Sequence, residues 1–103
     1  MARVYIRPKA RREINLVLVY YIENAGREIA QRFRRSANET FRALSENPLI
    51  GVVRKVRNPE FQGVRMWRVQ GFEGYLIFYR PRPSGITVER VIHASQDFQR
   101  MLR

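Results

Sequence analysis

An unbroken apolar run in the second half of the chain, Tyr75-Leu76-Ile77-Phe78-Tyr79, constrains the fold more than any other feature. Such a run, bounded by turn residues, predicts a central strand that is covered on both faces or nearly so. Strands are predicted on either side of it, at residues 64–69 and 86–93, with turns at 71–74 and 81–85. Since helices can cover only one face of this sheet, we expect its other face to carry aromatic side chains.

The first half of the chain has the periodicity of two helices. Between Lys9 and Glu23, apolar residues recur at spacings of three and four, and the segment 24–26, Asn-Ala-Gly, ends the pattern. A second helix is predicted from Arg27 to Ser45, with an apolar face and a basic outer face, before the Asn-Pro pair at 47–48.

Shorter signals complete the predicted order. Residues 4–6 form a β-prone run that Pro8 ends, and residues 49–63 read as a loop with a possible edge strand. Ser95 can cap a final helix that continues through Asp97, Phe98, Met101 and Leu102. The order β-α-α-β-β-β-α predicts an α+β fold in which a small antiparallel sheet packs against an N-terminal helical hairpin.

Composition limits the possible functions. The chain of 103 residues is long enough for one domain, which we assign to residues 1–103. It has no cysteine and one histidine, which excludes disulfides, thiolate or all-histidine metal sites and a cysteine nucleophile. We expect no cofactor and no metal, since phosphate-binding loops and paired carboxylates are also missing. The longest apolar stretch, residues 16–22, is too short to cross a membrane, and we expect a cytoplasmic protein.

The formal net charge of +11 points to a polyanion or an acidic protein as the partner. Arg65, Arg80 and Trp67 lie on or beside the predicted C-terminal strands, and the strand period places Arg65 and Trp67 on one face. Such a face could hold phosphates and stack bases, or its arginines could be solvated while its aromatic residues form the core. Arg11, Arg12, Arg32 and Arg35 lie on the outer faces of the helices and are partner-binding candidates, or a solvated surface.

His93 is the one side chain that titrates near neutral pH without help, and it ends the last predicted strand. It is either a reactive group at a strand end or a structural histidine that packs under the final helix.

Taken in order, several short motifs resemble the RelE/ParE superfamily of bacterial toxins from type II toxin-antitoxin pairs, and more closely its ParE branch. The resemblance covers nearly the whole chain and rests on residues 10–14 and 21–22, Ala30, Phe33, Leu44, Pro48, Gly51, Arg65, residues 75–80 and 91–94, and Asp97. It implies the same fold as the predicted order of elements.

The superfamily contains two activities, and the resemblance leaves both open. Members like RelE cut mRNA on the ribosome, and here Arg65, Arg80 and His93 could stabilise the phosphate and move a proton. Members like ParE inhibit DNA gyrase and block replication. Ala94 after His93, and Leu76 where the nuclease branch often has an arginine, favour the gyrase inhibitor. The resemblance also implies a cognate, ParD-like antitoxin, with an acidic amphipathic segment that suits a basic surface.

Overall fold

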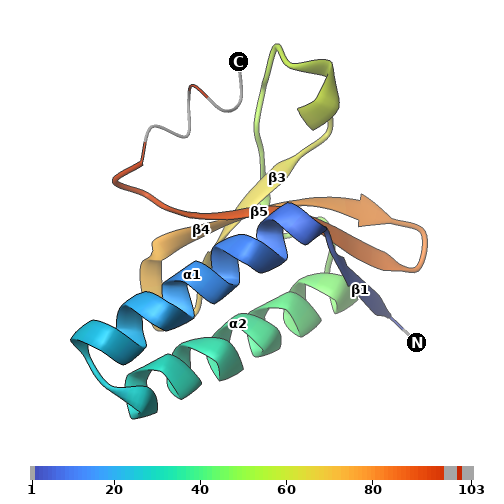
Figure 1. Ribbon diagram of the computed structural model, residues 1–103. Coiled ribbons are helices and arrows are strands. Elements are labelled where there is room, and N and C mark those ends of the chain that lie inside the picture. The colour runs from blue at the N-terminus through green and yellow to red at the C-terminus, as the bar shows by residue number, and fades with distance from the viewer. Residues whose placement is uncertain (1, 97–99, 101–103) are drawn as a thin grey trace.

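The computed structural model describes residues 2–96 and residue 100. Two antiparallel helices, α1 (Pro8–Asn24) and α2 (Arg27–Glu46), lie side by side across one face of a five-stranded sheet (Figure 1). The strands are β1 (Arg3–Ile6), β2 (Val52–Val53), β3 (Arg65–Val69), β4 (Phe72–Arg82) and β5 (Gly85–His93), and a short 3-10 helix, η1, spans Pro59–Phe61. The predicted α+β fold is confirmed, whereas the predicted final helix lies outside the described residues.

The sheet has the strand order β1-β5-β4-β3-β2, with β4 in its centre as the apolar run predicts. The strands from β2 to β5 pair antiparallel, but β1 pairs parallel to β5, with Val4 opposite Ile86. The sheet is therefore mixed rather than purely antiparallel. The predicted edge strand in the 49–63 loop is β2.

Both predicted turns are shorter in the structure because β4 is longer than its apolar run. It begins at Phe72, so that only residues 70–71 connect it to β3, and Gly71 takes a φ of +80° that glycine adopts readily. At its other end β4 continues to Arg82, through Pro81. This proline is tolerated because it lies beyond the last pair with β3, Arg65 opposite Tyr79, where β4 has a free edge.

Each face of the sheet has its own core. Under the helices, Phe33 and Phe41 of α2 pack with Ile77 and Tyr79 of β4, and all four are essentially inaccessible. On the other face Leu76, Phe78 and Ile92 pack against Phe61 and Val64. The loop that carries η1 therefore covers part of the face that no helix covers.

Glu13 of α1 connects the helical hairpin to the edge of β5. Ala94 N–H donates to Gly74 O, which makes this a hydrogen-bonded pair of the antiparallel ladder. Because hydrogen-bonded and non-hydrogen-bonded pairs alternate along such a ladder, the Val91 N–H, three residues earlier, points away from β4. β1 pairs with β5 only from Gly85 to Val88, so the Val91 N–H faces an uncovered edge. Glu13 Oε1 accepts from this N–H at 3.1 Å, and Glu13 Oε2 accepts from Arg90 Nη2 at 2.6 Å. One carboxylate thus satisfies the strand edge and neutralises a largely buried arginine.

A cluster of aromatic rings fills the space between the hairpin and the end of the sheet near Phe72. Tyr75 lies with its ring centroid 5.1 Å from that of Phe33 and 6.2 Å from that of Tyr21. Burial, together with a hydrogen bond with Tyr21, raises the pKa of Tyr75 to about 12. Burial also raises the pKa of Tyr79.

We expect Glu13→Ala to lower the free energy of unfolding by about 3 kcal/mol, because it leaves Arg90 largely buried without its counter-charge. The matched control is Glu23→Ala, which removes an exposed carboxylate of the same helix and should cost less than about 0.5 kcal/mol. Urea unfolding measures both. Equal losses in the two variants would contradict this role of Glu13.

Stability should also fall as the pH rises above about 10. The unfolded chain releases the Tyr75 proton near its ordinary pKa of 10, while the folded protein keeps it to about 12. The folded state then binds more protons, so the free energy of unfolding decreases through this range. Urea unfolding at several pH values should show a smaller decrease for Tyr75→Phe than for the unaltered protein. An unchanged decrease would show that Tyr75 does not contribute to it.

Candidate functional site

Arg65 is held by the loop that follows α2. Its Nη1 donates to Gly51 O at 2.8 Å and to Leu49 O at 3.0 Å. Tyr79, opposite Arg65 in the sheet, donates its hydroxyl to Pro48 O and accepts from Gly51 N–H, both at 2.8 Å. The guanidinium is therefore part of a network that fastens the end of α2 to the sheet.

Arg80 is also engaged within the fold. Its Nε lies 3.3 Å from Glu89 Oε2, and its side chain is only 24% exposed. Arg7 Nε lies 3.4 Å from the other oxygen of Glu89, which is itself 6% exposed. Two arginines thus share one buried carboxylate.

His93 ends β5 opposite Tyr75, and the two rings meet edge to face with centroids 4.9 Å apart. Its Nδ1 accepts from Ser95 N–H at 3.0 Å, so in the neutral ring the proton is on Nε2. A Cβ on Gly74 would lie 2.9 Å from His93 Nε2. Glycine at this position is therefore what lets the ring lie against β4.

The structure does not bring these three residues together. Arg80 pairs with Thr87, and the stretch of β5 from Thr87 to His93 spans about 20 Å at the rise of a strand. Arg65 lies two strands from β5, opposite Tyr79 rather than Tyr75. A single phosphate group cannot contact all three side chains in this arrangement.

The aromatic residues beside them belong to the core. Trp67 shares a face with Arg65, as the strand period predicts, but that face lies under the helices. Trp67 and Tyr75 are partly buried against this core, and Tyr79 is fully buried. These rings offer no open platform on which bases could stack.

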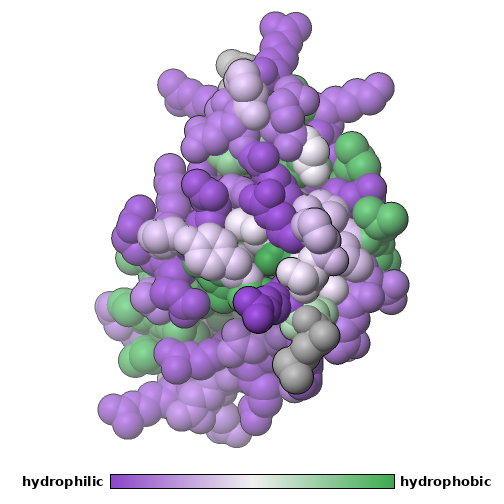
Figure 2. Space-filling model, turned by 90° about the vertical axis from the view of Figure 1, so that its right-hand side faces the viewer, coloured by the Kyte–Doolittle hydropathy of each residue, from purple (hydrophilic) through white to green (hydrophobic). Residues whose placement is uncertain are grey.

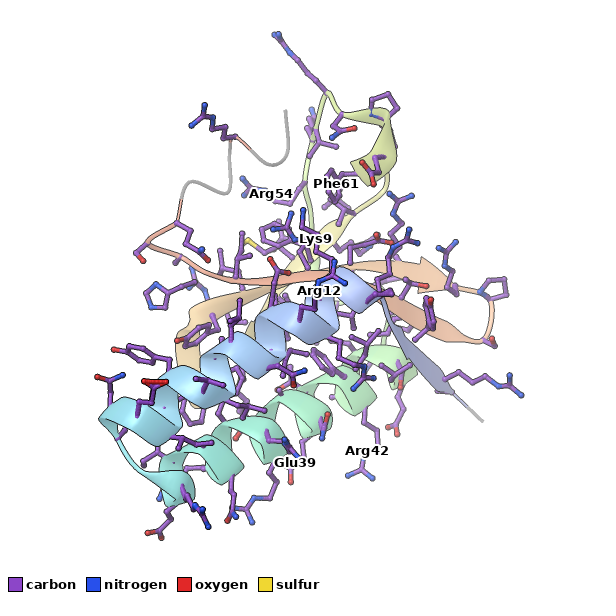
Figure 3. The ribbon with its side chains drawn as sticks, viewed as in Figure 1. Lys9, Arg12, Glu39, Arg42, Arg54 and Phe61 are labelled. Atoms are coloured by element: carbon purple, nitrogen blue, oxygen red, sulfur yellow. The ribbon has the colours of Figure 1, made fainter. Side chains whose placement is uncertain are left out.

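The four predicted helix arginines are all exposed, but they do not form one surface. Arg35 faces a groove between the helices, and Arg12 lines a second hollow of about 690 Å³ together with Arg7, Lys9 and Phe61. Figure 3 shows Lys9 and Arg12 on the side of the loop that carries Phe61, whereas Glu39 and Arg42 project from α2 on the side away from that loop. Arg11 and Arg32 line neither hollow.

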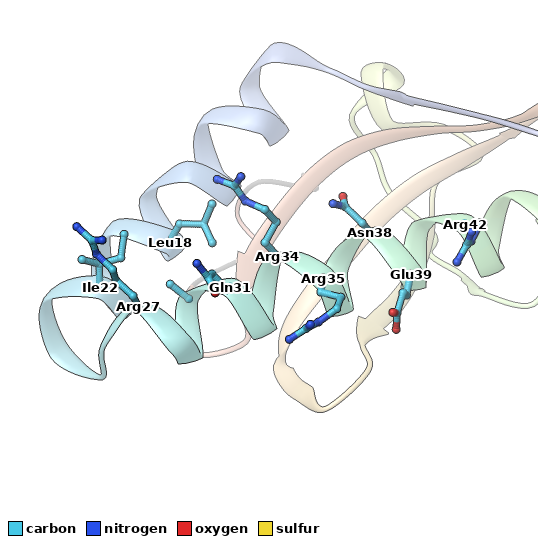
Figure 4. A pocket seen from close by; sticks show the side chains of 10 residues that line it. Leu18, Ile22, Arg27, Gln31, Arg34, Arg35, Asn38, Glu39 and Arg42 are labelled. Carbon is cyan, nitrogen blue, oxygen red and sulfur yellow. The ribbon is translucent and has the colours of Figure 1, made fainter.

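The groove between the helices has a volume of about 880 Å³ and combines an apolar floor with a charged rim. Leu18 and Ile22 extend into it from α1 (Figure 4). The other residues that line it come from α2: Arg27, Ala30, Gln31, Arg34, Arg35, Asn38, Glu39 and Arg42. Sequence analysis included Arg35 but missed Arg27, Arg34 and Arg42. Their spacing of seven and eight residues was the available signal, because it places them on one side of a helix.

On the face that Figure 2 shows, the surface is mostly hydrophilic and apolar side chains form small groups. Large apolar side chains that are exposed include Leu16, Leu49 and Val52. Within residues 2–96 and residue 100, no group of three or more histidine or acidic side chains could hold a metal ion. The described helices include none that is long and apolar enough to cross a membrane.

Comparisons with known proteins agree with the fold. Residues 4–98 match the family model described as the ParE toxin of the type II toxin-antitoxin system parDE. A solved structure titled "Chromosomal ParDE TA system from P. aeruginosa" superposes with a TM-score of 0.71 at 19% identity, over 90% of this chain and 96% of that one. No curated protein matches significantly. Because the family model covers almost the whole chain, the protein belongs to the ParE toxin family of type II toxin-antitoxin systems.

Proposed function

We propose that this toxin acts by binding DNA gyrase and inhibiting it, which blocks replication, and that a cognate, ParD-like antitoxin neutralises it. The separation of Arg65, Arg80 and His93 is the observation that supports this proposal most. A ribonuclease needs groups that stabilise one phosphate and move a proton at that same phosphate. Here Arg65 donates to Gly51 O and Arg80 pairs with Glu89. His93 lies at the far end of β5 from the residue that pairs with Arg80.

Charge supports a protein or polyanion partner in the cytoplasm, where gyrase acts. The net charge is +11, and Arg11, Arg32 and Arg35 are among the exposed arginines of α1 and α2. Exposed arginines on two helices attract an acidic partner over distances of about 8 Å at physiological salt. An acidic antitoxin would neutralise the positive charge of the same arginines.

The test is a supercoiling assay with purified gyrase, ATP, relaxed plasmid and increasing amounts of toxin. We expect a dose-dependent loss of supercoiling or an accumulation of cleaved plasmid. His93→Ala should inhibit within about twofold of the unaltered toxin, because we assign the ring no chemical role. Thermal unfolding checks that the variant is folded.

A ribosome-dependent mRNA cleavage assay with the unaltered toxin and with His93→Ala tests the alternative, ribonuclease activity. Growth arrest without any effect on gyrase, together with mRNA cleavage that His93→Ala abolishes, would replace gyrase inhibition with the ribonuclease activity.

A further inference from the structure

The hollow of about 690 Å³ lies between the start of α1, the loop that carries η1 and the part of β5 that follows its last pair with β1. It shares no lining residue with the groove between the helices, and none of Arg65, Arg80 and His93 lines it. Two of its lining residues, Pro8 and Phe61, are apolar. The others are charged or polar: Arg7, Lys9, Arg12, Asn58, Glu60, Glu89, Arg90 and Arg100.

Two cations of this hollow have no counter-charge. On its β5 side Glu89 is held between two arginines, and Arg90 is paired with Glu13. Lys9 and Arg12 are exposed, and within residues 2–96 and residue 100 no ion pair or hydrogen bond involves either side chain. They lie three positions apart on one helix, so their side chains are neighbours on its surface and their charges repel each other. An anion between them would relieve this repulsion.

The start of α1 adds to the positive charge. Its first turn contains no acidic residue, and the side chain of Arg7, the residue before the helix, makes no capping hydrogen bond. A cation such as Lys9 is unfavourable in this turn, because the N-terminus of a helix carries a partial positive charge. The stability of the isolated chain therefore does not explain this lysine, whereas an anion bound in the hollow would.

The donors of the hollow suit a phosphate group better than a protein surface. Lys9 and Arg12 supply charged donors. Asn58 adds the Nδ2 of its amide, since its Oδ1 already accepts a main-chain N–H at 3.0 Å. Phosphate oxygens accept several such bonds at once. A bound protein helix or strand would need an apolar floor, but Phe61 is only 8% exposed.

The surroundings favour the backbone of duplex DNA over a free phosphate or a single strand. Exposed cations continue beyond the hollow along the chain, with Arg11 on α1 and with Lys55 and Arg57 just before Asn58. A row of cations can contact successive phosphates of one strand. Single strands are bound largely by stacking of their bases, and the buried Phe61 ring offers no face for it.

We propose that this hollow binds the phosphate backbone of duplex DNA, independently of its sequence. The inference goes beyond the proposed function, because it gives the toxin a contact with DNA itself rather than with gyrase or an antitoxin. A toxin that contacts both gyrase and its DNA would bind the complex more tightly than gyrase alone, since two contacts made together raise the apparent affinity.

The experiment measures binding of the toxin to a short labelled duplex of mixed sequence, by fluorescence anisotropy at physiological salt. Lys9→Glu/Arg12→Glu should weaken binding by at least about tenfold, because it reverses two charges in the hollow. The matched control, Arg32→Glu/Arg35→Glu, lowers the net charge equally at exposed positions that do not line the hollow. It should weaken binding by less than about threefold, since salt screens distant charges.

The stability of the variants separates a loss of binding from a loss of fold. Lys9→Glu places a carboxylate in the first turn of α1, where a negative charge is favourable. The double variant Lys9→Glu/Arg12→Glu should therefore unfold at the same urea concentration as the unaltered toxin or at a higher one. Glu60→Gln changes the charge in the other direction, and we expect it to tighten binding to the duplex by about threefold.

The outcomes separate this inference from the proposed function. If Lys9→Glu/Arg12→Glu binds the duplex as tightly as Arg32→Glu/Arg35→Glu, the hollow does not bind DNA, although gyrase inhibition stands. An equal loss of affinity for polyglutamate would overturn the assignment to phosphate. Displacement of the duplex by millimolar inorganic phosphate, but not by chloride of equal ionic strength, would overturn the assignment to the DNA backbone. A toxin that binds DNA through the hollow without affecting gyrase would overturn the proposed function alone.

Discussion

The arrangement of the two layers depends on the contact between Glu13 and the edge of β5. Burial of apolar surface between the layers is not directional, whereas a hydrogen bond to a main-chain group has a defined geometry. The Glu13 carboxylate accepts from a main-chain N–H and from Arg90, and both bonds require a defined position of α1. The groove between α1 and α2 is therefore presented in one orientation relative to the sheet.

A second polar network has the same effect on α2, at the point where this helix ends. Arg65 and Tyr79 bind the carbonyl and amide groups of residues 48–51, where α2 has ended and the chain turns toward β2. Gly51 has no side chain here because a Cβ would meet the Tyr79 ring within 3 Å. Residues that could have served chemistry on a phosphate therefore serve to hold the loop.

The elements were predictable from the sequence because their signals are local. Apolar spacing identified both helices, and the run from Tyr75 to Tyr79 identified the central strand. The structural roles of Arg65, Arg80 and Arg90 were not predictable, because each side chain contacts a residue from another part of the chain. Glu13 and Arg90 are separated by 77 residues, and no periodicity links them. The parallel direction of β1 likewise depends on a distant strand, since Arg3 lies opposite Gly85, and residues 3–6 alone do not indicate it.

The arginines of this toxin fall into two groups, according to whether they have a partner within the fold. Some, such as Arg80 and Arg65, are partly buried and lie beside a carboxylate or donate to several carbonyl groups. Those on the helices, such as Arg34 and Arg35, face solvent beside an apolar floor and have no such partner in residues 2–96. Like charges gathered around exposed Ile22 add nothing to the stability of the isolated chain.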